Sequence, residues 1–340
     1  MRRHTSHEYC FDMDRKVVFR LGSADVSQIR FGISPGHELA HAVRTVLDPG
    51  AHPLQWSWLR RTDVRVEDAD FRLLAYLVRT QGYYPDLLTA PPTWDLSPAE
   101  EVERLREVPL EQVELDLGKV VLRSEGTGRA LVQALAERPR EARARIADAW
   151  ESVWDQVMAQ WWPQLHRLMR ADVDLRVRRM ATGGVEEMVG TLHELVRWRS
   201  DAVEVALSSF EEVLDCAGSG LVLTPSVMSV PRCSVITEKA LQPTIFYPVD
   251  GLRESWAARD VDTMPALSGL LGSGRARVLV ALDGPRSTTE AARAAGLGAP
   301  TATHHLGALR AAGLVVSRRE RRSVLHSRTP LGDALVGGAA

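Results

Sequence analysis

Residues 287–313 carry helix start and stop signals at a spacing that few folds can accommodate. Residues 287–290 have the sequence S-T-T-E, a capping box in which the first and last side chains satisfy free backbone N–H groups at a helix start. Gly296 is predicted to end this helix. The sequence G-A-P at 298–300 predicts the start of a second helix, since Pro is favoured at the first helical position, and Gly313 predicts its end. Two short helices joined by a glycine-containing turn form a helix-turn-helix.

The residues on either side complete a larger pattern. Residues 273–282 are predicted to form a preceding helix, which the D-G-P sequence at 283–285 ends. After the second helix, residues 314–318 and 323–328 are predicted to be the two strands of a hairpin, joined by the polar turn 319–322. The order helix, helix, turn, helix and hairpin predicts a winged helix-turn-helix.

Charge is distributed unevenly along the chain. Residues 265–340 contain ten arginines, no lysine and four acidic residues, a formal charge of +6. The remaining 264 residues contain 32 basic and 40 acidic residues, a charge of −8, so the total of −2 hides an asymmetry. A basic segment attached to an acidic body favours a nucleic-acid partner for the basic part.

The predicted helix-turn-helix and hairpin place side chains where DNA would lie. The second helix of such a motif enters the major groove with its N-terminal residues toward the base edges, and its first backbone N–H groups can hold a phosphate. An arginine-rich hairpin tip suits the phosphate backbone or the minor groove. The predicted DNA-contacting residues are Ser287, Thr288, Thr301, Thr303, His304, His305, Arg310, Arg318, Arg319, Arg321 and Arg322.

Residues 264–332 resemble an ArsR-type winged-helix transcriptional regulator. The run A-P-T-A-T-H-H-L-G-A-L-R-A-A-G-L-V at 299–315 is similar to the recognition helix of that family, and residues 318–326 correspond to its wing. The resemblance implies a homodimer that reads a palindromic operator. Metal-sensing members carry a Cys-x-Cys pair, or His and Asp ligands on a long C-terminal dimer helix. Neither occurs here, so we expect no metal site of that kind.

The first 250 residues are predicted to be mostly helical, with a few strands. Residues 19–35, together with 220–225 and 246–248, resemble a domain of unknown function that precedes ArsR-type DNA-binding domains in actinobacterial regulators. That resemblance implies a regulatory or dimerisation role and identifies no ligand. The predicted helices lie at 34–47, 66–79, from 97 onward, at 139–180 with a kink or break at Pro163, and at 185–197, and the predicted strands lie at 16–21, 219–225 and 243–248.

The predicted fold class is therefore mainly α with minor β, a helical N-terminal domain followed by a C-terminal winged helix-turn-helix. Three widely spaced cysteines favour reduced thiols in a cytoplasm. No apolar run approaches the length of a membrane span, and no signal peptide is expected. The predicted parts are a flexible N-terminus at 1–15, a regulatory or dimerisation domain at 16–250, a linker at 251–264, the winged helix at 265–332 and a tail at 333–340.

One motif favours a different class of protein. Residues 37–41 have the sequence H-E-L-A-H, the H-E-x-x-H pattern in which two His one helical turn apart hold Zn²⁺ and the Glu acts as general base. His37, Glu38 and His41 would then make the protein a zinc-dependent hydrolase with an accessory basic domain. The alternative is that both His side chains serve the fold. No third ligand follows at a familiar spacing.

The sequence thus predicts a DNA-binding transcription regulator that binds double-stranded DNA as a homodimer. It predicts that the protein is not an enzyme, has no cofactor and does not associate with membranes. The prediction allows a small-molecule effector of the N-terminal domain and does not identify it. The tryptophans at 150, 154, 161 and 162 would line its pocket or pack in a core or dimer interface. A winged helix that binds another protein instead of DNA is the third hypothesis.

Overall fold

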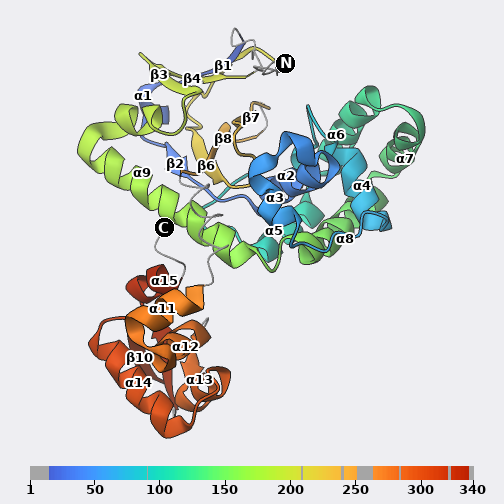
Figure 1. Ribbon diagram of the computed structural model, residues 1–340. Coiled ribbons are helices and arrows are strands. Elements are labelled where there is room, and N and C mark those ends of the chain that lie inside the picture. Colours follow the sequence, from blue (N-terminus) through green and yellow to red (C-terminus); the bar gives the residue numbers. More distant parts are fainter. Residues whose placement is uncertain are drawn as a thin grey trace, which may run out of the picture. The chain divides into compact units, whose positions relative to one another are not determined.

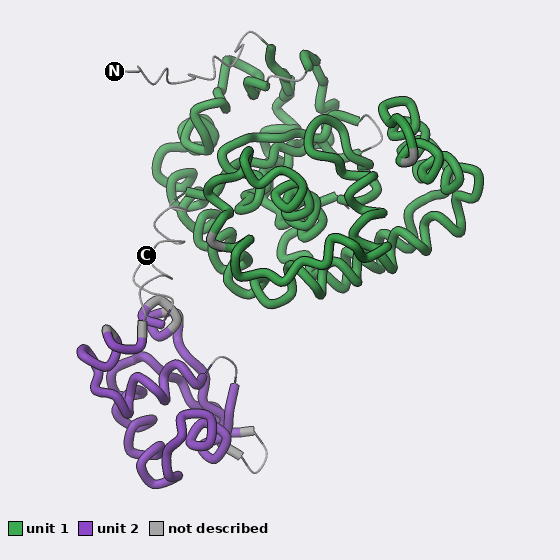
Figure 2. The backbone as a smooth tube through the Cα atoms, turned by 45° about the vertical axis from the view of Figure 1, so that its right-hand side comes forward, with its two compact units in different colours: residues 1–250 green, residues 251–340 purple. Residues whose placement is uncertain are grey.

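The computed structural model describes residues 15–89, 91–207, 210–238, 241–250, 263–282, 285–320 and 323–336. The chain divides into two compact units, unit 1 at residues 1–250 and unit 2 at residues 251–340 (Figure 2). Nearly all of the predicted flexible N-terminus at 1–15 and of the predicted linker at 251–264 falls outside the described residues. Each unit is described on its own below.

Helices make up most of the described part of unit 1, as the sequence predicts. Ser34 begins one helix by accepting a hydrogen bond from the His37 N–H, and Ser97 begins another as part of a capping box with Glu100. Pro163 falls in the first turn of a new helix and separates it from the preceding one, which confirms the predicted break. The helices are α1 (Ser23–Val26), α2 (Pro35–Leu47), α3 (Trp56–Leu59), α4 (Ala69–Val78), α5 (Pro98–Glu107), α6 (Leu110–Arg123), α7 (Gly126–Ala136), α8 (Pro139–Val157) and α9 (Trp162–Gly190), with 3₁₀ turns η1 (Pro49–Ala51), η2 (Pro53–Gln55) and η3 (Asp86–Leu88).

Two four-stranded sheets accompany these helices (Figure 1). In the first sheet β1 pairs antiparallel with β4 and parallel with β5, and in the second β6 runs parallel to both β2 and β8 while β7 is antiparallel to β8. The first sheet has the order β3 (Val196–Arg199), β4 (Ala202–Ala206), β1 (Lys16–Arg20), β5 (Glu212–Asp215). The second has the order β2 (Arg30–Phe31), β6 (Val222–Ser226), β8 (Thr244–Pro248), β7 (Ser234–Ile236).

The prediction of a helical N-terminal domain is therefore only partly right. The helix predicted at 185–197 is wrong beyond Gly190, because the chain continues as β3 and pairs with β4. The predicted break before it is present: Gly184 adopts φ 83° and ψ 175°, outside helical geometry, although helical residues continue on both sides. The strands predicted near residues 16–21, 219–225 and 243–248 correspond to β1, β6 and β8.

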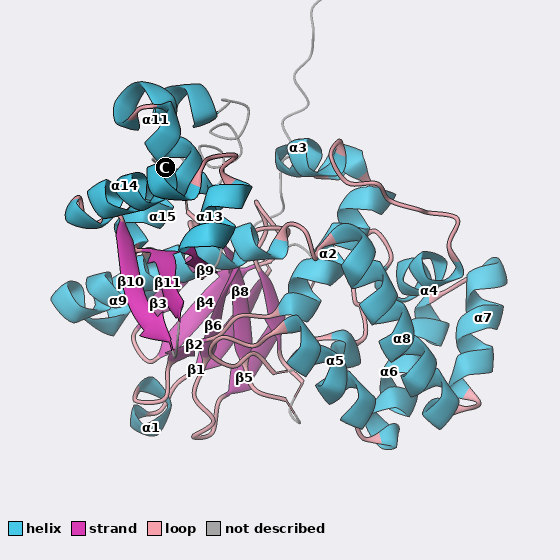
Figure 3. Ribbon diagram, turned by 90° about the horizontal axis from the view of Figure 1, so that it is seen from below, coloured by secondary structure: helices cyan, strands magenta, loops and turns pink. Residues whose placement is uncertain are grey.

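The two sheets share one hydrophobic core. Phe19 of β1, Leu223 of β6 and Ile245 of β8 are fully buried in it, together with Met188 near the end of α9. All five residues of β6 and all five of β8 are buried, as expected for parallel strands covered on both faces. Helices α4 to α8 gather to one side of these strands (Figure 3). Helix α2 lies between the two groups, and eleven of its thirteen residues are buried.

A buried ion pair fastens α9 to the second sheet. Arg176 donates to Asp172 Oδ1 over 3.0 Å within α9, and both side chains are almost wholly excluded from water. Asp172 also accepts a hydrogen bond from the Tyr247 hydroxyl of β8 at 2.8 Å and one from the Asp250 N–H at 3.2 Å. Every charge in this group is therefore compensated, which a buried pair requires if it is not to destabilise the fold.

Unit 2 has the predicted order of elements. Its core consists of apolar residues from α12, α13 and α14 with the start of β10, and Leu306 and Leu309 pack beside Leu279 and Ala291 as the sequence predicts. The elements are α11 (Thr263–Leu271), α12 (Ser273–Ala281), β9 (Arg286–Ser287), α13 (Thr288–Ala294), α14 (Ala299–Ala311), β10 (Val315–Glu320), β11 (Ser323–Arg328) and α15 (Pro330–Val336).

Three of these elements were not predicted. Helix α11 precedes the predicted first helix, α15 follows the hairpin and contacts α11, and β9 pairs with β11 to make a three-stranded sheet of order β10-β11-β9. Strand β9 is only two residues long, so it has no sequence periodicity that could reveal it. The wing is thereby joined to the segment that leads into α13.

Replacing Arg176 by Met should lower the free energy of unfolding of unit 1 by about 3–5 kcal/mol, because Asp172 would stay buried without its countercharge. Denaturant unfolding followed by tryptophan fluorescence measures this, since eight of the nine tryptophans belong to residues 1–250. Arg170→Met is the matched control on the same helix, because its ion pair with Asp95 is exposed and should contribute less than about 1 kcal/mol. Equal losses in the two variants would contradict the prediction.

Candidate nucleic-acid interface

The turn between α13 and α14 is built from its glycines. Ser287 Oγ accepts a hydrogen bond from the Glu290 N–H, and Glu290 Oε2 accepts one from the Ser287 N–H at 2.8 Å, so the predicted capping box is present. Gly296 ends the first helix at φ 62°, a left-handed conformation that favours glycine. Gly298 is the N-cap residue of α14, and because glycine has no side chain it offers no acceptor to the first N–H groups of the helix. The N–H groups of the first turn of α14 therefore face no side-chain acceptor, as a phosphate-binding helix start requires.

Helix α14 has one buried and one exposed face. Ala302, Leu306 and Leu309 are buried in the core of unit 2. The exposed side carries residues of the kind that contact bases and phosphates, namely Thr301, Thr303, His304, Gly307 and Arg310. Thr303 Oγ1 donates to the Ala299 carbonyl at 2.8 Å, which fixes its rotamer and leaves the hydroxyl oxygen as an acceptor.

His305 lies apart from that exposed face. It is half-buried and packs against Gly274 near the start of α12, where an added Cβ would come within 2.3 Å of the His305 Nε2. Burial, with the nearby charges of His304, Arg275 and Arg277, lowers the pKa of His305. The side chain thus supports the packing of α14 on α12, where glycine at position 274 leaves room for the imidazole.

Ser287 and Thr288, two other residues predicted to contact DNA, make hydrogen bonds within unit 2. Ser287 is occupied by the capping box, and Thr288 Oγ1 lies 2.9 Å from His326 Nε2 of β11. The other ring nitrogen of His326 lies 2.8 Å from Ser317 Oγ on β10. His326 is only 8% exposed and connects the start of α13 with both strands of the wing. The sequence analysis missed this residue, and its position opposite Ser317 in the hairpin is the signal that could have revealed it.

The arginines of unit 2 fall into two groups. Arg318 and Arg319 are exposed on β10, where they can reach a nucleic acid, and Arg310 is exposed on α14. Arg328 instead donates to the carbonyls of Leu279 and Val280 at the C-terminal end of α12 and so stabilises the helix there. Arg321 and Arg322, also predicted to contact DNA, lie outside the described residues.

Comparison with known families agrees with this geometry. Residues 275–318 match a family described as a helix-turn-helix domain, and residues 117–253 match a family of unknown function (DUF5937). The chain carries a helix-turn-helix domain behind a domain of unknown function. This is the architecture that the sequence resemblance implied, and it indicates a DNA-binding regulator. No curated protein and no solved structure matches the chain.

Membrane association was expected to be absent. Among the residues that the structure describes, no helix has both the length and the apolar composition that crossing a bilayer requires.

The H-E-x-x-H motif lies inside unit 1. His37, Glu38 and His41 are all buried on α2. The Glu38 carboxylate accepts hydrogen bonds from the Ser226 hydroxyl and from the N–H groups of Val227 and Met228. Three donors thus engage the Glu38 carboxylate at the end of β6, whereas a general base faces the attacking water. Over the described ranges no three His, Cys, Asp or Glu side chains are grouped as metal ligands.

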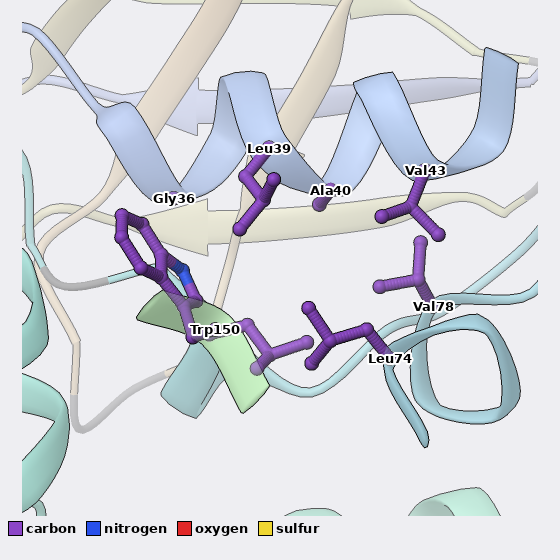
Figure 4. Close-up of a pocket in the computed structure, with 8 residues that line it drawn as sticks. Gly36, Leu39, Ala40, Val43, Leu74, Val78 and Trp150 are labelled. Carbon is purple, nitrogen blue, oxygen red and sulfur yellow. The ribbon is translucent and has the colours of Figure 1, made fainter. Parts of the chain in front are cut away.

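Trp150, Trp154, Cys216 and Cys233 also serve the core. Trp150 and Trp154 stack with ring centroids 5.0 Å apart, and Trp150 lines an apolar cavity of about 10 Å³ between α2, α4 and α8 (Figure 4). That volume is about what a single water molecule needs, so the cavity is a packing feature. Burial raises the pKa of the thiols of Cys216 and Cys233 to about 12, which keeps them protonated and unreactive.

Thr288→Val should destabilise the wing and the start of α13 by about 1–3 kcal/mol, because it leaves a buried nitrogen of His326 without a partner. Amide hydrogen exchange across α13, β10 and β11 measures the loss. Thr301→Val is the matched control: it is the same substitution on the exposed side of α14, where the change should stay within about 0.5 kcal/mol. Equal exchange rates in the two variants would argue against the role of His326.

The groups on α2 predict a pH dependence of stability. Burial holds the pKa of His41 well below 6.5, so the unfolded chain binds a proton there that the folded chain lacks, and stability falls as the pH drops below 6.5. Glu38 acts in the opposite direction, because burial raises its pKa from 4.5 to about 7. Between pH 7 and pH 4.5 the folded chain binds a proton there that the unfolded chain lacks, so this group makes stability rise as the pH falls.

His41→Gln should remove one proton from this linkage. Between pH 6.5 and 5.5 the free energy of unfolding of the variant should fall by about 1 kcal/mol less than that of the parent. The measurement is denaturant unfolding at a series of pH values, compared as slopes so that a general loss of stability cancels. Parallel slopes would show that His41 is not a buried neutral imidazole.

Proposed function

We propose that this protein is an ArsR-type transcription regulator in the cytoplasm, whose unit 2 binds operator DNA and whose unit 1 senses a signal or mediates dimerisation. The observation that carries the proposal is the exposed side of α14. No side chain caps the N-terminus of this helix, and its exposed residues include Thr301, Thr303, His304 and Arg310. The domain that contains it matches the helix-turn-helix family. Each of these groups can donate to or accept from a base edge or a phosphate.

The contacts divide by chemistry. Thr301, Thr303 and His304 are assigned to base edges in the major groove, and Arg310, about two turns along α14, to a base or an adjacent phosphate. Arg318 and Arg319, together with Arg321 and Arg322 of the same hairpin, are assigned to the phosphate backbone or the minor groove. Ser287, Thr288 and His305 hold α13, the wing and α14 in place.

A homodimer fits this reading, because a regulator that reads a palindromic operator presents two recognition helices one helical turn of DNA apart. Unit 1 offers the larger surface for such a contact. Its small-molecule effector, if it uses one, acts by changing the affinity of unit 2 for DNA, which is a coupling free energy between two sites.

The test is the salt dependence of DNA binding by the full chain. Genome-wide footprinting first identifies the bound sites, and the dissociation constant for one site is then measured over a range of salt concentrations. Each phosphate contact contributes about one unit to the slope of log K against log salt. Arg318→Gln and Arg319→Gln should each reduce that slope by about one unit and weaken binding to all sequences similarly.

Two controls accompany this measurement. Arg197→Gln, an exposed arginine on β3 of unit 1, should leave affinity and slope unchanged. Thr303→Val should alter the preference among DNA sequences more than the salt slope, because base contacts carry specificity. Binding without discrete DNA sites, a slope insensitive to the wing arginines, or equal binding by a chain ending at residue 262 would overturn the proposal.

A further inference from the structure

Several buried polar atoms around α2 have no hydrogen-bond partner among the described residues. They are His37 Nε2, both ring nitrogens of His41, His52 Nδ1 and Gln55 Oε1. His37 is fully buried and His41 is 6% exposed. Buried polar groups in folded proteins are almost always paired, because each unpaired one costs roughly 1–3 kcal/mol. A set of such atoms at one place is therefore a candidate position for a bound polar molecule.

The two imidazoles lie against one another. Their ring centroids are 4.4 Å apart, and His37 also stacks on Phe246 at 3.8 Å. His37 Nδ1 lies 2.9 Å from the Tyr84 hydroxyl. Burial raises the pKa of Tyr84, so this hydroxyl keeps its proton and can donate it to Nδ1. When Tyr84 donates to Nδ1, the neutral His37 ring carries its own proton on Nε2, and the unpartnered nitrogen is a donor.

The charges around these rings are positive. Arg44 follows on the same helix, with its guanidinium 4.9 Å from the centroid of the Tyr84 ring, and Arg232 lies in the segment after β6. Arg44 and Arg232 both lower the pKa of His41, as do His37 and His52. The acidic groups Asp86, Glu38 and Glu101 act on the pKa of Tyr84 and Asp48 acts on that of His52, while the Glu38 carboxylate is held by residues 226–228. The charged groups that act most strongly on the pKa of His41 are all basic.

The cluster extends to the surface. Arg232 is exposed and Tyr84 is half-buried, whereas His52 is 4% exposed and His41 lies deeper along α2. An anion could therefore first meet the Arg232 guanidinium and then reach the imidazoles. Arg44 is already fixed by hydrogen bonds to the Val78 and Gly82 carbonyls, so it contributes charge without having to move.

We propose that unit 1 binds a small carboxylate at His37 and His41, with Arg44 and Arg232 supplying the compensating charge. Two neighbouring ring N–H donors match the two oxygens of a carboxylate, and no run of backbone N–H groups of the kind that cradles phosphate is seen there among the described residues. The same geometry disfavours a cation, because Arg44 is beside the rings and Glu38 is engaged elsewhere. This binding identifies a ligand class for unit 1 and does not depend on whether unit 2 binds DNA.

The experiment is calorimetric titration of the full chain with sodium acetate, with ionic strength held constant by sodium chloride and DNA absent. Saturable binding of one acetate per chain is expected, together with a rise in the melting temperature of unit 1. His41→Phe should abolish binding. Arg232→Gln, which changes an exposed side chain and should leave the fold intact, should weaken binding about threefold. Arg129→Gln, on the exposed side of α7, is the matched control and should bind like the parent.

Two further arms define the ligand class. Inorganic phosphate should bind at least tenfold more weakly than acetate, and zinc chloride should give no saturable binding that His41→Phe removes. Absence of acetate binding, unchanged binding in Arg232→Gln and His41→Phe, or tighter binding of phosphate or zinc than of acetate would each overturn the proposal. None of these outcomes bears on the DNA experiment, so the two proposals fail separately.

Discussion

Unit 1 depends on the buried carboxylate of Glu38. It joins α2 to the end of β6 by accepting hydrogen bonds from Ser226, Val227 and Met228. A buried carboxylate is costly unless its oxygens are satisfied, so this contact fixes how far along the strand the helix can lie. Once α2 is fixed, its apolar side, with Leu39 and Val43, faces α4 and α8, and its imidazole side faces Phe246 and Tyr84. The residue that made α2 resemble a zinc site is thus the one that holds the fold together.

The sequence revealed unit 2 well because its signals are local. A capping box, two helix-ending glycines and a proline at a helix start act within four residues of where they stand, and all of them appear in α13 and α14. The contacts that it did not reveal connect distant positions: Thr288 to His326 across 38 residues, and Arg328 to Leu279 across 49. These contacts set the position of the wing relative to α12 and α13. The two helices of the candidate interface could therefore be predicted, whereas the contacts that place the wing beside them could not.

In unit 1 the same distinction separates helices from strands. Strands β6 and β8 are buried on both faces and stand out as apolar runs, but β3 and β4 alternate apolar with charged residues and β1 pairs with β4 across nearly 190 residues. The spacing of His37 and His41 fixes that they share one face of α2, but not that this face is buried. That depends on Glu38 finding donors in residues 226–228, far along the chain, which no local pattern records.

Formal charge overstates what unit 2 can offer to DNA. Arg328 is committed to the carbonyls that end α12, whereas Arg275 and Arg277 on the same helix are exposed. The charge of +6 over residues 265–340 is therefore divided between the fold and the surface. The salt dependence of DNA binding counts only the cations that displace counterions from phosphates. The salt dependence should thus reflect the exposed arginines of α14 and the wing. Its slope should be smaller than the number of arginines in residues 265–340.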